Sequence, residues 1–194
     1  MSGFRSRAGL CARRSEVDEV GTEADPTFQS VICLLNKITM DHEFFMKKAL
    51  ALAKKGLGYT SPNPMVGAVI VKDGEVIGKG YHQAVGRAHA EVNAIEDAGV
   101  RAKGATLYVN LEPCNHTGRT PPCTRKILEA GIQRVVVALA DPNTLAAGGS
   151  ACLRQHGIEI LTGVCKSRAA RLNEAFLKYV NTKCPFVTIK CAAT

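Results

Sequence analysis

Residues 106–140 read TLYVNLEPCNHTGRTPPCTRKILEAGIQRVVVALA, and this stretch decides the fold class. The apolar runs Thr106–Leu111 and Arg134–Ala140 predict two buried strands. Between them lies a predicted helix, Cys123–Ala130, which follows two prolines and precedes a glycine, as helices commonly do. A strand, a helix and a second strand in this order predict a parallel pair joined by a helical crossover, the repeating unit of α/β folds.

The flanking sequence extends the same pattern. Upstream, the apolar runs Val66–Val71 and Val76–Tyr81 flank an Asp-Gly turn, which predicts a β-hairpin, and a helix is expected over His89–Ala98. The alternation of strands and helices predicts an α/β domain whose sheet is mostly parallel after the hairpin. The other expected elements are helices beginning at Asp41, ending at Leu153 and spanning Arg168–Val180, and strands at Ile158–Leu161 and Phe186–Ala192.

The net charge of +8 lies entirely on residues 40–194, because residues 1–39 carry five basic and five acidic side chains. Residues 1–39 show no sustained periodicity and are predicted to form a flexible extension. A basic globular part suits an anionic partner, either a phosphorylated metabolite or nucleic acid, as well as it suits simple solubility. The absence of Trp argues against a nucleic-acid surface built on base stacking. No apolar run reaches the ~18 residues of a membrane helix, so no membrane partner is expected.

The chain contains eight cysteines, and no secretory signal precedes them, because the basic start is followed by acidic residues rather than an apolar stretch. A reduced, cytoplasmic setting is therefore expected, in which clustered cysteines suggest a metal rather than disulfides. Cys114 and Cys123 form such a pair. The other six cysteines are interpreted as apolar fillers or incidental thiols.

Three segments together supply the ligands of a catalytic zinc site. His89 begins a predicted helix, Cys114 follows the end of a strand, and Cys123 begins another helix. One imidazole and two thiolates are three ligands, which leaves the fourth position of a tetrahedral Zn²⁺ for water, as catalytic sites require. Each residue alone is commonplace, but their coincidence at the ends of consecutive α/β elements is rare.

Glu91 is expected to move protons rather than bind the metal. It lies two residues after His89, so the two side chains do not share a helix face. A carboxylate beside the water can take its proton, protonate a ring nitrogen and then protonate the leaving amine. This arrangement is the H-x-E…P-C motif of zinc deaminases, in which the Glu is not a ligand.

Four stretches resemble the deaminase half of the bifunctional deaminase/reductase of riboflavin biosynthesis, a member of the cytidine deaminase-like superfamily. The resemblance extends from about Met40 to the C-terminus. Most zinc nucleoside deaminases use Cys-x-x-Cys, whereas the eight-residue gap between Cys114 and Cys123 is specific to the riboflavin family. The four stretches are SPNPMVGAVIV at 61–71, HAEVNA at 89–94, LEPCNHTGRTPPC at 111–123 and DPN at 141–143.

The resemblance implies a three-layer α/β/α fold with a mixed sheet in the strand order 2-1-3-4-5. It implies zinc-dependent hydrolytic deamination of 2,5-diamino-6-ribosylamino-4(3H)-pyrimidinone 5′-phosphate to 5-amino-6-(5-phosphoribosylamino)uracil and ammonia. The residues expected to line the substrate pocket by similarity are Asn63, His82, Arg119, Asp141 and Asn143.

The chemistry of these side chains fits such a substrate. Asn63 can bond the amide edge of a ring, Arg119 can pair with a phosphate, and Asp141 or Asn143 can hold ribose hydroxyls. His116 lies between the two cysteines and is expected to be a loop residue rather than a ligand.

The sequence departs from the family pattern near Thr144, where a Pro is usual, and in the loop 145–150, which is one residue short. The segment from Asn173 onward resembles the linker and first strand of the reductase domain. The predicted organisation is therefore an extension at 1–39, a zinc deaminase domain at 40–164, and a linker helix with the start of a truncated reductase domain at 165–194, without reductase activity.

Two alternatives stay open at this point. One is another deaminase of the same fold, such as one that acts on tRNA, and the other is an inactive remnant that serves as an interaction module. The intact His89, Glu91, Cys114 and Cys123 favour an active enzyme. The oligomeric state is left open, a homo-oligomer included.

Overall fold

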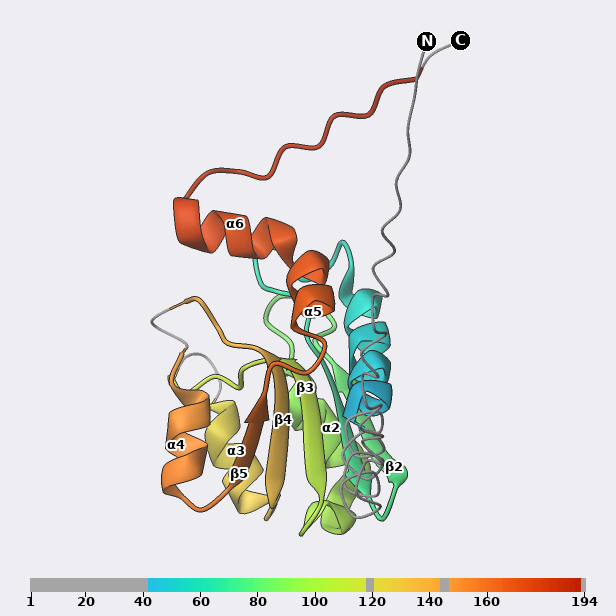
Figure 1. Cartoon of the computed structure of the whole chain (residues 1–194), viewed down its shortest axis with the longest axis vertical. Helices are drawn as coiled ribbons and strands as arrows, with labels where there is room; N and C mark the ends of the chain where they lie inside the picture. The colour runs from blue at the N-terminus through green and yellow to red at the C-terminus, as the bar shows by residue number, and fades with distance from the viewer. Residues whose placement is uncertain (1–41, 118–120, 144–146, 193–194) are drawn as a thin grey trace, which may run out of the picture. The chain divides into compact units, whose positions relative to one another are not determined.

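The computed structural model describes residues 42–117, 121–143 and 147–192. The predictions made for residues 1–39, for the helix start at Asp41, and for Arg119 and Thr144 lie outside these ranges. Within them, five strands form one sheet with helices packed against it (Figure 1). Every helix among the described residues is too short or too polar to cross a membrane.

The strands lie in the order β2-β1-β3-β4-β5. β1 pairs antiparallel with both β2 and β3, whereas β3, β4 and β5 run parallel. The mixed sheet and its predicted order 2-1-3-4-5 are therefore confirmed, and the predicted strands agree with these five to within one residue at each end. The strands are β1 (Gly67–Lys72), β2 (Glu75–Tyr81), β3 (Thr106–Leu111), β4 (Arg134–Leu139) and β5 (Glu159–Thr162).

Helices cover both faces of the sheet. Alternate side chains of β4 point to opposite faces, because successive residues of a strand do so. Val135 and Val137 pack with side chains of α2, α3 and α4, whereas Val136 packs with the helix at 42–53 and with α5. The three-layer α/β/α architecture is therefore confirmed. The helices are 42–53, α2 (Ala90–Ala98), α3 (Cys123–Glu129), α4 (Gly149–Gln155), α5 (Lys166–Leu172) and α6 (Glu174–Thr182), with 3₁₀ turns at Lys54–Gly56 and Gly99–Ala102.

The single helix predicted over Arg168–Val180 is wrong, because the chain breaks at Asn173 into α5 and α6. The Asn173 side chain is buried, with its amide oxygen accepting from the Met65 N–H at 2.8 Å and its amide nitrogen donating to the Met65 carbonyl at 3.0 Å. Asn side chains readily bond to backbone groups in non-helical conformations. A contact with a distant loop thus interrupts a pattern that is locally helical.

The strand predicted at Phe186–Ala192 is also not formed, since residues 184–192 adopt neither strand nor helix. A strand requires a hydrogen-bonded neighbour, and none of the five described strands pairs with this segment. The predicted division between a deaminase domain and a linker at residue 165 stays a prediction. The part of that segment in α5 packs on the sheet through buried Ala169.

Candidate metal centre and active site

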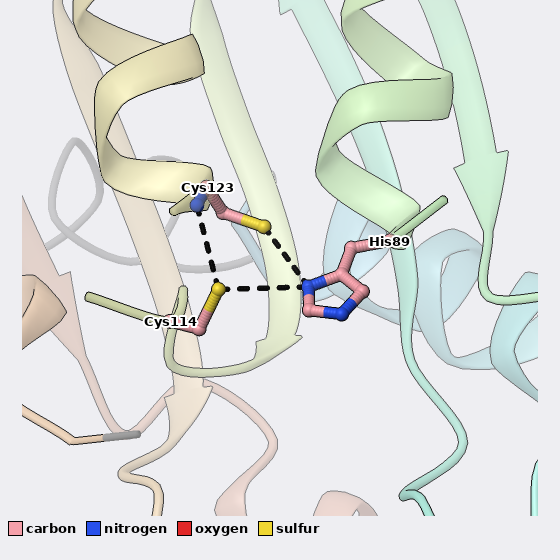
Figure 2. A group of neighbouring side chains, drawn as sticks. All are labelled: His89, Cys114 and Cys123. Carbon is pink, nitrogen blue, oxygen red and sulfur yellow. Dashed lines mark hydrogen bonds between the residues drawn. The ribbon is translucent and has the colours of Figure 1, made fainter. Parts of the chain in front are cut away.

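Three side chains from separate elements converge near the carboxyl end of the middle strand, β3 (Figure 2). His89 directly precedes α2, Cys114 lies in the loop after β3, and Cys123 is the first residue of α3. The His89 Nδ1 lies 3.1 Å from the Cys123 Sγ and 3.5 Å from the Cys114 Sγ. All three ligand atoms lie within 4.8 Å of one another, so a single ion could contact them all.

Local sequence explains why these elements meet. The first turn of α2 packs against β2 at Gly80, where a Cβ would overlap the carbonyl oxygen of Ala90. The Cys123 N–H donates to the Cys114 Sγ at 3.4 Å, which ties the start of α3 to the loop after β3. Helix N-termini carry partial positive charge and free N–H groups, and these two features favour a thiolate beside the start of a helix.

The electrostatics of the site fit a bound cation. The hydrogen bond with Cys123 lowers the pKa of Cys114 to about 4, with help from His89 and against the effect of burial. The pKa of Cys123 is raised, first because of its hydrogen bond with Cys114 and then because of burial and nearby Glu91. A divalent cation would offset the repulsion between two buried thiolates, and one nitrogen with two sulfurs suits zinc.

A cavity of about 440 Å³ opens beside this group. The cavity walls include four of the five predicted substrate-binding residues, and the fifth, Arg119, lies outside the described residues. His116 also lines the cavity and lies outside the cluster of potential ligands. The four residues are Asn63, His82, Asp141 and Asn143.

Hydrogen bonds orient two of these side chains toward each other. The His82 Nδ1 lies 3.1 Å from the Ala88 carbonyl oxygen, which can only accept, so Nδ1 carries the proton. The Asn63 amide nitrogen then donates to the His82 Nε2 at 3.4 Å. Burial lowers the pKa of His82, which agrees with a neutral ring.

Residues 39–139 match the family described as the cytidine and deoxycytidylate deaminase zinc-binding region. The chain belongs to this zinc-binding deaminase family. The match covers β1 to β4 and all three potential ligands, so zinc is the metal that the family and the donor set agree on.

Individual relatives are identical to this chain at about half of the aligned positions. The riboflavin biosynthesis protein RibD of Aquifex aeolicus is 57% identical over 151 residues, which are 77% of this chain and 42% of that protein. The structure of Acinetobacter baumannii RibD has a TM-score of 0.74 at 50% identity and covers 76% of this chain and 42% of that one. A Thermotoga maritima diaminohydroxyphosphoribosylaminopyrimidine deaminase/5-amino-6-(5-phosphoribosylamino)uracil reductase has the same TM-score and identity, with 76% and 43% covered. The chain thus spans about two fifths of the length of these relatives.

Glu91 lies in the first turn of α2 and is only 3% exposed. Its pKa is raised to about 7, chiefly because burial disfavours the carboxylate, and the proximity of His89 opposes the rise. A buried carboxyl group that lines the cavity near neutral pKa can both accept and donate a proton. The role of proton shuttle for Glu91 stays a prediction.

Sequence reasoning missed several residues that line the deaminase cavity. Arg87 precedes α2, Glu112 follows β3, and Phe176 comes from α6. Glu112 could have been found, because it stands in the motif that contains Cys114. Phe176 carries no such signal, because it lies on α6, far along the chain from the motifs of the site.

Proposed function

We propose that this chain catalyses the zinc-dependent hydrolytic deamination of 2,5-diamino-6-ribosylamino-4(3H)-pyrimidinone 5′-phosphate. The products are 5-amino-6-(5-phosphoribosylamino)uracil and ammonia. One observation carries the proposal: three potential zinc ligands and the buried Glu91 share a cavity with Asn63, His82, Asp141 and Asn143. The activity for which the Thermotoga maritima relative is named supports the choice of substrate.

The residues of the chain divide the chemistry between them. His89, Cys114 and Cys123 hold the zinc, which when bound lowers the pKa of a coordinated water so that it reacts near neutral pH. Glu91 takes one proton from the water and delivers it to the ring nitrogen, and it passes the second to the leaving amine. The water oxygen ends on the ring carbon, the carbon–nitrogen bond breaks, and the amine leaves as ammonia.

The remaining residues expected to bind substrate orient it. Asn63, held by neutral His82, binds the amide edge of the ring. Asp141 and Asn143, in the loop after β4, bind ribose hydroxyls. Arg119 binds the phosphate, in keeping with the basic character of residues 40–194.

The experiment compares wild type with Glu91→Ala. Zinc content is measured together with ammonia release from the pyrimidine phosphate, from cytidine, from deoxycytidylate and from tRNA. We expect stoichiometric zinc in both proteins, and ammonia only from the pyrimidine phosphate with wild type. Release from tRNA alone would replace this proposal with a nucleic-acid deaminase, and a zinc-free, inactive wild type would support an interaction module.

A further inference from the structure

Glu112 lies in the cavity wall, yet the reaction proposed above gives it no task. It follows β3 and stands two residues before Cys114. Its own N–H donates to the Leu139 carbonyl at 2.9 Å, which continues the parallel pairing of β3 and β4 beyond the end of β3. The backbone of Glu112 is therefore fixed to the sheet, and its side chain starts from a rigid position.

The Glu112 carboxylate accepts two backbone hydrogen bonds from the segment that connects β4 to α4. The Asp141 N–H donates to Oε2 at 3.2 Å, and the Ser150 N–H donates to Oε1 at 2.8 Å. These donors stand at the two described ends of the segment, 141–143 and 147–150. The Ser150 N–H belongs to the first turn of α4, where N–H groups have no partner within the helix.

A close backbone contact accompanies these hydrogen bonds. At Gly149, a Cβ would overlap the carbonyl oxygen of Pro113, the residue before the potential ligand Cys114. The Asn143 N–H in turn donates to the Asp141 Oδ1 at 2.9 Å. The two cavity-lining residues Asp141 and Asn143 are therefore linked to each other, at the end of the segment that Glu112 holds. Glu112 thus connects the loop of a metal ligand to the segment that carries Asp141 and Asn143.

The residue type matters because both bonded groups are donors. A carboxylate offers two acceptor oxygens, whereas a Gln amide offers one oxygen and an NH₂ group that would face an N–H. Bonds to a charged acceptor are also stronger than neutral ones. Only Glu has both the reach and the two acceptors that this position uses.

We propose that Glu112 is a positioning residue that sets the distance between the zinc ligands and the substrate-binding segment 141–143. It acts on substrate binding through Asp141 and Asn143 and does not touch the reacting atoms. The predicted effect of Glu112 on KM rests on the proposed deaminase function. The predicted effect of Glu112 on the position of the segment does not.

The kinetic experiment compares Glu112→Gln with Glu129→Gln, an exposed carboxylate on α3 that pairs with Arg125. We expect Glu112→Gln to raise KM about tenfold, because hydrogen bonds to a charged group are lost, with little change in kcat and full zinc content. The control variant should keep wild-type values. An unchanged KM would overturn the proposal, and so would loss of zinc, because Glu112 would then support the ligand loop alone.

A double-mutant cycle tests the route of the effect. Combined with Asn143→Ala, Glu112→Gln should add much less than its separate effect on KM, because both changes remove the same substrate contacts. Combined with Asn63→Ala, on the loop before β1, the two effects should add. Additivity in both pairs would contradict action through the 141–143 segment. If Glu112→Gln fails to fold, Glu112→Asp, which keeps the charge but shortens the reach, takes its place with the same expected rise in KM.

A third measurement does not depend on activity. Hydrogen exchange of the Asp141 and Ser150 amides, followed by NMR, should be faster in Glu112→Gln than in wild type and unchanged in Glu129→Gln. Wild-type exchange rates in the variant would overturn the proposal. If wild type does not deaminate the pyrimidine phosphate while these amides still depend on Glu112, the proposed function fails and the positioning role stands.

Discussion

The two sides of the catalytic cavity are built in different ways. On the metal side, His89 and Cys123 stand at the starts of α2 and α3, so the position of each ligand follows from where a helix begins. On the substrate side, Asn63, Asp141 and Phe176 come from two loops and from α6. Side-chain hydrogen bonds to backbone groups hold these parts in place, through Asn173 at Met65 and Glu112 at Asp141 and Ser150.

Under the proposed function, the difference separates chemistry from recognition. Secondary structure fixes the metal side cooperatively, and the buried strands beneath it tolerate few changes. The substrate side depends on a few individual contacts, each of which one substitution can remove. We therefore expect substitutions on the metal side to abolish the reaction, and substitutions on the substrate side to alter mainly KM or stability.

The largest effect is expected for Cys123→Ser. Loss of one of three protein ligands should remove zinc and abolish ammonia release, because a hydroxyl is a poor ligand for zinc compared with a thiolate. Metal analysis and the ammonia assay measure this, with the exposed Cys184→Ser as control. Full zinc content in Cys123→Ser would contradict the expectation that substitutions on the metal side have larger effects than those on the substrate side.

A large effect is also expected for Gly149→Ala, on the substrate side. The added Cβ would overlap the Pro113 carbonyl oxygen, so the segment must shift away from the loop of Cys114. Overpacking of this kind costs about 1–3 kcal/mol of stability, and KM should rise while zinc is retained. Thermal unfolding and steady-state kinetics measure the two, and wild-type KM would show that the segment does not bind substrate.

An intermediate effect is expected for Asn173→Ala. The substitution leaves the part-buried N–H of Met65 without its acceptor, which costs about 1–3 kcal/mol of unfolding free energy. Denaturant unfolding measures the loss, with the exposed Asn181→Ala near the end of α6 as control. Equal stabilities would mean that the link between α6 and the loop before β1 contributes nothing.

The smallest effect is expected for Phe176→Ala. Its ring forms part of the cavity wall from α6, and its loss should raise KM about fivefold through reduced apolar contact. Tyr179→Ala, on the same helix and 51% exposed, is the matched control. An unchanged KM in Phe176→Ala would mean that α6 does not contribute to substrate binding and that only the loops do.

The sequence by itself determined the sheet and the metal side. Residues 135–139 in β4 form a continuous apolar run, and such runs predict buried strands because both their faces are covered. The positions of His89 and Cys123 followed from helix starts, which short-range residue patterns mark. Both kinds of signal lie within a few residues, whereas the strand order 2-1-3-4-5 was expected from the family resemblance.

Only the tertiary structure decided the contacts that hold the substrate side in place. The bond between Asn173 and Met65 joins residues 108 apart and breaks a helix that the local pattern predicts as continuous. The bond between Glu112 and Ser150 joins residues 38 apart, and the segment at 186–192 stays out of the sheet despite its strand-like sequence. These outcomes depend on which groups meet after the chain has folded, because a hydrogen bond forms only where donor and acceptor come within reach.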